Sequence, residues 1–207
     1  MTAPSSVKER PILFSAPMVR AILAGTKTQT RRIVKPQPRI LAGKLLCWRD
    51  DALTDDQMAA LCPYGVPGDR LWVRETWRLS LAGGFFVYRA DPGRDESTAA
   101  FNRQDPSIKW KPAIHMPRDA SRITLEITHV RVERLQEISE EDAIAEGINR
   151  IAHGREGYFY HAHRTEPHPK NWIDPADAYR ELWREINGSG SWEANPWVWV
   201  VCFRRLP

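Results

Sequence analysis

The stretch PILFSAPMVRAILAGTKTQTRRIVKP, residues 11–36, places a short apolar strand, a helix and a basic turn in immediate succession. Residues 12–14 predict the strand, and Ser15 is a suitable N-cap for the helix that follows. Gly25 ends that helix, because glycine readily adopts positive φ. The polar run 26–32 is therefore held between two ordered elements, which is how short side chains are fixed in a functional site.

Turn and capping residues predict the elements outside this stretch. Pro67-Gly68-Asp69 is a turn signal, Ser139 begins a short helix that Gly147 closes, and Asp174 caps a helix that ends at Asn187-Gly188. The predicted strands cover residues 70–77, 85–88, 121–132 and 197–203, and a further short helix covers residues 54–61.

Two periodic patterns predict inward faces. In the strand 121–132, alternation places Ile127 and His129 on the same side as the preceding apolar residues. In the last helix, Tyr179, Trp183 and Ile186 belong to a packed stripe at helical spacing.

Several strands separated by turns, with few helices and no regular βα alternation, indicate an α+β protein built on a small mixed β-barrel with short flanking helices. Residues 1–10 are predicted to be a flexible N-terminus, and residues 11–207 a single domain. Segments without strong periodicity predict long loop insertions near residues 35–66, 90–112 and 149–172.

Composition limits the classes of protein that fit. The chain has 207 residues, 42% hydrophobic and 27% charged, and a formal net charge of +4, which permits a nucleic-acid partner without requiring one. No apolar run is long enough to cross a membrane, and the first residues lack the apolar core of a signal peptide, so the cytoplasm is the expected compartment. The three cysteines are widely spaced, which indicates reduced thiols and neither a disulfide framework nor a zinc site.

Several motifs together resemble one known family. They are LAGTKTQTRR at residues 23–32, PGD at 67–69 and AIAEG at 143–147, with FSAPMVRAILAG at 14–25 and IHMPRDASR at 114–122. This set is similar to the ASCH domain of the PUA-like superfamily, in the longer form found in bacterial and prophage genomes. The resemblance implies a PUA-like barrel over most of the chain.

The resemblance also implies a catalytic set, because some ASCH proteins hydrolyse N4-acetylcytidine. The matching residues are Lys27, Thr30 and Glu146. In one version a Lys27 of lowered pKa takes the proton of the Thr30 hydroxyl, which then attacks the amide. In the other version Glu146 activates a water and Lys27 stabilises the oxyanion. Neither version needs a metal or a cofactor.

Polar and aromatic residues elsewhere are candidates for substrate binding. Arg31 and Arg32 adjoin the catalytic set, and five further candidates lie at strand ends or in connectors: Arg74, Glu75, Trp77, His115 and Arg118. Arginine and tryptophan can stack on a base or bond its edge. Each has a structural explanation as well, since charge runs are usually solvated and the period of Trp77 with Val73 favours the core.

His161, His163 and His168 suggest a metal site, but no cysteine or carboxylate pattern accompanies them. A surface loop with scattered histidines is therefore favoured over a zinc site.

Two functions follow from these observations. The first is a metal-independent amidohydrolase that removes an acyl group from N4 of a modified cytidine. The second is an RNA-binding PUA-like module, with or without ribonuclease activity, that lacks this chemistry. The expected partner is a modified nucleoside or RNA, and no obligatory protein partner is indicated.

Overall fold

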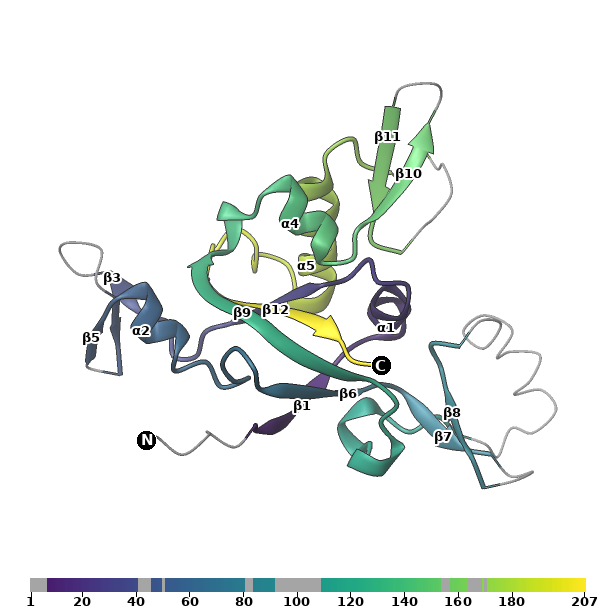
Figure 1. Cartoon of the computed structure of the whole chain (residues 1–207). Helices are drawn as coiled ribbons and strands as arrows, with labels where there is room; N and C mark the ends of the chain where they lie inside the picture. The colour runs from purple at the N-terminus through teal and green to yellow at the C-terminus, as the bar shows by residue number, and fades with distance from the viewer. Residues whose placement is uncertain are drawn as a thin grey trace.

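The computed structural model describes residues 7–40, 46–49, 51–80, 84–91, 109–153, 157–163, 169 and 171–207. These residues form a mixed α+β structure around one five-stranded sheet, as expected for the class (Figure 1). The strand order is β1-β6-β9-β12-β2. The strands are β1 (Glu9–Leu13), β2 (Gln29–Ile33), β6 (Arg70–Arg74), β9 (Thr124–Arg134) and β12 (Trp197–Arg205).

The first strand and β6 run parallel, whereas the other neighbouring pairs are antiparallel. Alternation in β6 is as the sequence predicts: Leu71 and Val73 are buried, and burial on the same face continues through Glu75 and Trp77 beyond the strand. Strand β1 begins at Glu9, two residues before the expected start of the domain.

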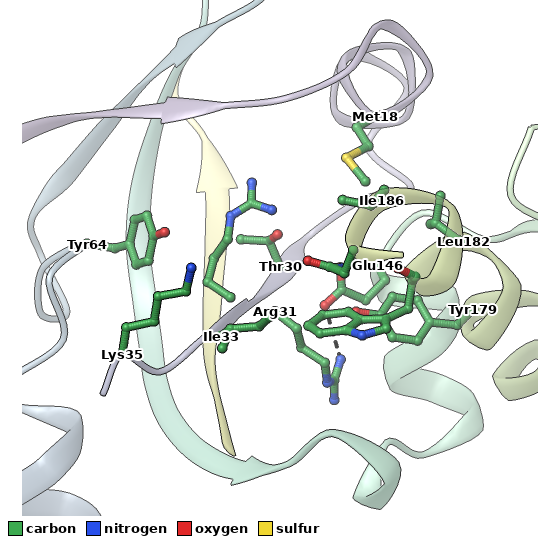
Figure 2. Close-up of a pocket in the computed structure, with 13 residues that line it drawn as sticks. Met18, Thr30, Arg31, Ile33, Lys35, Tyr64, Glu146, Tyr179, Leu182 and Ile186 are labelled. Atoms are coloured by element: carbon green, nitrogen blue, oxygen red, sulfur yellow. Dashed lines mark hydrogen bonds and ion pairs between the residues drawn. The ribbon is translucent and has the colours of Figure 1, made fainter. Parts of the chain in front are cut away.

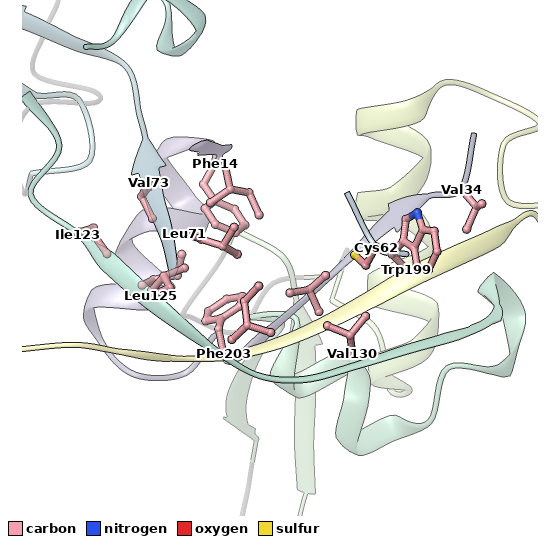
Figure 3. Packing of buried hydrophobic residues seen from close by; sticks show 14 of the residues in the cluster. Phe14, Val34, Cys62, Leu71, Val73, Ile123, Leu125, Val130, Trp199 and Phe203 are labelled. Atoms are coloured by element: carbon pink, nitrogen blue, oxygen red, sulfur yellow. The ribbon is translucent and has the colours of Figure 1, made fainter. Parts of the chain in front are cut away.

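Strand β12 separates two apolar clusters. Trp199 and Phe203 pack in the first cluster with residues of β1, β6 and β9, as Figure 3 shows. Val198 and Val200 point into the second cluster. A strand that is buried on both faces needs a continuous apolar run, which is what residues 197–203 supply.

Helices cover both faces of this sheet. Helix α1 (Ala16–Leu23) and α2 (Asp55–Ala59) contribute to the first cluster, and α4 (Glu140–Ala145) and α5 (Pro175–Asn187) to the second. The caps agree with the sequence. The side chain of Ser139 accepts a hydrogen bond from Asp142, and that of Asp174 accepts one from Ala176. Three short 3-10 helices cover Ala113–His115, Arg118–Ala120 and Leu135–Glu137.

Three small sheets surround the large one. Strands β3 (Arg39–Ile40), β4 (Leu46–Trp48) and β5 (Asp51–Leu53) lie within the first expected insertion, beside α2. Strands β7 (Trp77–Leu79) and β8 (Phe86–Tyr88) form a hairpin, and β10 (Asn149–His153) and β11 (Gly157–His161) form another. The last hairpin occupies the insertion near 149–172, for which the sequence predicted no strand. Most of the expected insertion near 90–112 lies outside the described residues.

The sheet does not close into the expected barrel in the part of the chain that the structure describes. Strands β1 and β2 are its two edges, and no backbone pairing joins them. A side chain spans this seam instead, because Nη2 of Arg32 donates to the carbonyl oxygen of Leu13 at 2.7 Å. The open seam leaves space between β1, β2 and the helices next to them.

Two predicted faces are wrong in detail. His129 is exposed because the register shifts beside it, so that Ile127 pairs with Phe203 and His129 with Cys202, and Thr128 is left over as a bulge. Ile186 is 53% exposed, although its neighbours in the stripe of α5 are buried. Among the described residues no helix is long and apolar enough to cross a bilayer.

Candidate functional site

The turn after α1 carries Lys27 into the protein. Gly25 has a φ of 76°, and the N–H groups of Thr26 and Lys27 both donate to the carbonyl of Ala21, at 2.9 and 3.1 Å. Lys27 then forms an isolated β-bridge with Glu146, at the end of α4. Because β2 begins only two residues later, the turn, and not strand alternation, sets the direction of this lysine.

Lys27 and Glu146 form a buried ion pair. Nζ of Lys27 donates to Oε2 of Glu146 at 2.8 Å and to its main-chain carbonyl at 2.7 Å. The two side chains are 0% and 3% exposed. The next residue, Gly147, has a φ of 96°, and a Cβ there would lie 3.2 Å from the Cβ atoms of Lys27 and Ala21. Only glycine lets the end of α4 approach so closely without displacing a neighbour.

Arg31 supports the same carboxylate from the other side. Its Nη1 donates to Oε1 of Glu146 at 3.2 Å, and its Nη2 lies 2.5 Å from Glu133 and 2.6 Å from Asp142. Arg131 also donates to Glu133 and Asp142. With the lysine, three cations therefore face three carboxylates, and this network (Lys27, Arg31, Arg131, Glu133, Asp142 and Glu146) has no net charge when every group is ionised.

Burial changes the proton affinity of several groups here. Desolvation lowers the pKa of Lys27 from 10.5; the Glu146 carboxylate opposes this change, and Arg32 and Arg31 add to it. Burial alone would lower the pKa of Arg31, but the carboxylates of Glu146 and Glu133 raise it above its usual value. Burial and the Glu146 carboxylate both raise the pKa of Tyr179 well above 10, so this phenol stays neutral.

Thr30 and Glu146 face one cavity of about 290 Å³ (Figure 2). In the figure Thr30 and Glu146 lie in the middle, with Tyr64 on one side and Ile186 of α5 on the other. The Thr30 hydroxyl makes no hydrogen bond to any described residue. Lys27 is not part of the cavity wall, and it reaches the cavity only through its contact with Glu146.

A second cavity of about 520 Å³ adjoins the first one at the seam of the sheet. The two share Met18, Arg32, Tyr64 and Ile186 in their walls. The second is lined mainly by apolar residues of β1 and the residues just after it. We refer to the two adjoining cavities as the cleft.

The cleft includes some of the residues that the sequence proposed for substrate binding. Arg32 lines both cavities and Arg74 lines the second. Arg31 lines the first, but its guanidinium is committed to three carboxylates.

Four other candidates lie outside both cavities. Glu75 is buried and pairs with Arg122 at 2.9 Å, and Trp77 packs in a small apolar cluster. His115 and Arg118 are exposed, and Arg118 pairs with Glu9. Structural contacts therefore account for Glu75, Trp77 and Arg118.

Sequence reasoning did not find Tyr64, Lys35, Met18 or Tyr179 as wall residues. Tyr64 and Lys35 come from the insertion near 35–66, where no periodicity marks them. No sequence signal identifies Tyr64 as a wall residue. In the structure the next residue must be glycine, because Gly65 has a φ of 124° and a Cβ there would lie 2.8 Å from Oδ2 of Asp69.

No group of three or more His, Cys, Asp or Glu residues that could hold a metal exists among the described residues. His161 and His163 lie close together, with ring centroids 6.1 Å apart, whereas His168 falls outside the described residues.

We compared the chain with protein-family models, with curated proteins and with solved structures, and no match was found in any of the three comparisons.

Proposed function

We propose that this protein is a metal-independent amidohydrolase that removes an acyl group from N4 of a modified cytidine, and that its domain is of the ASCH type. One observation carries the proposal. The Glu146 carboxylate faces the cavity, and the buried cations Lys27 and Arg31 hold this carboxylate in place. The Thr30 hydroxyl faces the same cavity and has no hydrogen-bond partner in the described structure. A fixed carboxylate can act as the general base for amide hydrolysis, and a free hydroxyl can donate a hydrogen bond to the oxyanion.

The contacts favour the version in which water attacks. Glu146 takes a proton from a water, which adds to the acyl carbonyl. Lys27 does not line the cavity, so the Thr30 hydroxyl takes the role expected of Lys27 and donates a hydrogen bond to the oxyanion. When the intermediate collapses, the C–N bond breaks and Glu146 returns the proton to the departing N4 amine, giving cytidine and a carboxylic acid. Lys27 acts as a positioning residue, because its ammonium group fixes Glu146 and does not line the cavity.

In the other version Thr30 is the nucleophile and Lys27 its base. This version needs Nζ of Lys27 within hydrogen-bond reach of the Thr30 hydroxyl, whereas the described hydrogen bonds of this amine go to two oxygens of Glu146. The versions differ in a measurable species. A Thr30 nucleophile forms an acyl ester on the enzyme, which intact-mass spectrometry of rapidly quenched reactions detects as an added acyl group on residue 30. We expect no such adduct, and its presence would establish Thr30 as the nucleophile.

Incubation of the purified protein with N4-acetylcytidine, with and without EDTA, tests the proposed function. We expect conversion to cytidine that EDTA does not change. Glu146→Gln should reduce kcat by at least about 100-fold, because general acid–base catalysis contributes 10²–10⁴-fold. Glu126→Gln is the matched control, since Glu126 pairs with Arg204 outside both cavities. If the wild type converts no substrate, or if Glu146→Gln is as active as the control variant, the hydrolase proposal fails.

An RNA-binding module without this chemistry is the alternative. The observation in its favour is that Arg32, Lys35 and Arg74 line the cleft and form no ion pair with any described residue. Such a module would bind RNA through Arg32 and Lys35 but would be indifferent to Thr30→Ala. RNA binding that survives Thr30→Ala, in a protein that releases no acetate from any acetylated substrate, would support the module.

A further inference from the structure

Three cations of the cleft have no carboxylate partner. Arg32, Lys35 and Arg74 form no ion pair with any described residue. Arg31, next to Arg32 in sequence, is by contrast paired with carboxylates. Unpaired cations are common on open surfaces. Here they line two adjoining cavities, in which a bound ligand would be partly shielded from water.

The two arginines are held by neutral groups. Nη2 of Arg32 donates to the carbonyl of Leu13 at 2.7 Å, and its guanidinium lies 5.3 Å from the centre of the Phe14 ring. Nε of Arg74 donates to the carbonyl of Met116 at 3.1 Å, and Nη2 donates to that of Ile114. Carbonyls and rings orient a guanidinium but do not neutralise it, and each group keeps N–H donors for a ligand.

The remaining charges of the cleft cancel. Glu146 is the only carboxylate in the two described cavity walls, and Lys27 and Arg31 compensate it. Glu133, Asp142 and Arg131 complete the neutral network behind it. The unpaired Arg32, Lys35 and Arg74 therefore give the cleft a positive charge. Arg32 lies in the wall of both cavities, so an anion bound there is next to the cavity that contains Thr30 and Glu146.

We propose that the substrate carries a phosphate group on the ribose of the acylated cytidine, and that Arg32 and Arg74 bind this phosphate with help from Lys35. The substrate class is thus a nucleotide, either free or within a strand, in preference to an uncharged nucleoside. Arginine forks suit phosphate because they donate two parallel hydrogen bonds to its oxygens. The inference rests on the proposed function for the acylated base, but the phosphate site can be tested separately.

Kinetic comparison of three substrates tests the inference. They are N4-acetylcytidine, its 5′-monophosphate and a short single-stranded RNA with one N4-acetylcytidine. We expect kcat/KM to be at least about tenfold higher for the phosphorylated substrates, which corresponds to one charge-assisted hydrogen bond. A monophosphate as good as the RNA identifies a free nucleotide as the substrate, and a clear preference for the RNA identifies a strand.

Substitution of Arg32 tests whether this cation causes the preference for phosphorylated substrates. Arg32→Gln should lower kcat/KM for the monophosphate about 10- to 100-fold, mainly through KM, and lower that for the nucleoside less, because the lost interactions are with phosphate. Arg204→Gln is the matched control, since Arg204 pairs with Glu126 outside both cavities. Equal kcat/KM for nucleoside and monophosphate, together with the same loss for both in Arg32→Gln, would overturn the inference and leave the hydrolase proposal standing.

Binding without turnover separates the two proposals. Calorimetry with the wild-type protein compares cytidine 5′-monophosphate with cytidine, neither of which carries an N4-acyl group that could be hydrolysed. Tighter binding of the monophosphate that weakens with Arg32→Gln and with added salt supports the phosphate site even if no acetylated substrate is converted. Equal affinity for both ligands contradicts it.

Discussion

Glu146 is the residue that connects the two buried cations to the cavity. Each of its oxygens receives a hydrogen bond from a different buried cation, Lys27 at Oε2 and Arg31 at Oε1. Removing charged groups from water costs several kcal/mol for each ion, so such an arrangement is weak support for stability by itself. Its value lies in fixing the carboxylate at the cavity wall, with its rotamer set by two partners on different elements.

A double-mutant cycle measures how strongly this pair is coupled. We expect Lys27→Met and Glu146→Gln each to lower the free energy of unfolding by about 2–4 kcal/mol, because each leaves a buried partner behind. The double variant should be less destabilised than the sum, with a coupling of about 1–3 kcal/mol. The measurement is urea denaturation followed by tryptophan fluorescence.

The exposed pair Arg204 and Glu126 is the control for this cycle, and its coupling should not exceed about 1 kcal/mol. Strictly additive losses for the buried pair would show that Lys27 and Glu146 do not act together.

The charge of Lys27 also predicts the pH dependence of activity. Burial lowers its pKa in the folded protein below the usual 10.5, so the ammonium group that fixes Glu146 is lost before pH 10.5 is reached. We therefore expect kcat/KM to fall with rising pH on the alkaline side, below 10.5, and this limb to be absent in Lys27→Met. If neutral Lys27 were the base for Thr30, activity would rise over the same range instead.

The same shift has a consequence for stability. Between the lowered pKa and 10.5, the unfolded chain keeps the proton of Lys27 while the folded protein has released it. The unfolded state then binds more protons, so the contribution of Lys27 to the free energy of unfolding rises with pH in this window. Comparing urea midpoints of the wild type and Lys27→Met across the window measures this contribution.

At the scale of elements, the ends of two helices place the ion pair of Lys27 and Glu146. Helix α1 ends before Gly25 and α4 before Gly147, and the two ends meet where Lys27 bridges Glu146. Helix α5 ends before Gly188, which also has positive φ but is surrounded by open space. Gly188 is therefore required only for its positive φ, whereas Gly147 is required both for its positive φ and for the lack of space for a Cβ.

Substituting two of these glycines by alanine tests the close approach. Gly188→Ala should lower the free energy of unfolding by roughly 1 kcal/mol, because only the positive φ of 92° is strained. Gly147→Ala adds a Cβ at 3.2 Å from Lys27 and Ala21, so we expect about 1–3 kcal/mol more, together with a loss of activity. Thermal denaturation and the deacetylation assay give the two readouts, and equal effects of both substitutions would contradict the crowding at Gly147.

Sequence reasoning predicted elements well where a local residue determines them. Caps at Ser139 and Asp174 and the stop at Gly25 agree with the structure, because each depends only on its own hydrogen bonds or φ. The prediction that His129 faces inward was wrong, because a bulge in β9 shifts the alternation of side chains by one residue. The prediction that Ile186 is packed was wrong. Helical spacing shows which residues share one side of a helix, but not where the element packed against that side ends and a cavity begins.

At the scale of the whole molecule, the cleft lies at the seam where the sheet remains open. Edge strands β1 and β2 contribute residues to its walls, and α5 and the loop after α2 complete them. The family motifs pointed to Thr30 and Glu146, which line one cavity, but they could not predict that Tyr64 lines it as well. It is distant in sequence from both, and its position depends on how the loop that contains Gly65 packs against Asp69 and Arg10.

Tyr64 supplies the prediction at this scale. Its half-buried ring lines both cavities, so we expect it to stack on the base. Tyr64→Ala should reduce kcat/KM by about 5- to 150-fold, which corresponds to about 1–3 kcal/mol of stacking, and Tyr64→Phe should retain most activity. Tyr158→Ala is the control, because Tyr158 is 45% exposed on β11, outside both cavities. If Tyr64→Ala matched this control, the ring would have no part in binding.

The origin of Tyr64 and Lys35 has a consequence for how such a protein can change. Both belong to the segment that leaves the central sheet after β2 and returns at β6, whereas Lys27, Thr30 and Glu146 belong to the sheet and to helix ends packed on it. On the proposed function, the ring that stacks on the base thus lies in a different stretch of the chain from the reacting groups, although the phosphate-binding Arg32 and Arg74 belong to strands of the central sheet. Trp48 of this segment packs edge-on against Trp199, with ring centroids 5.9 Å apart. On the proposed function, a different segment that keeps this contact would present other side chains to the base and leave the reacting groups the same.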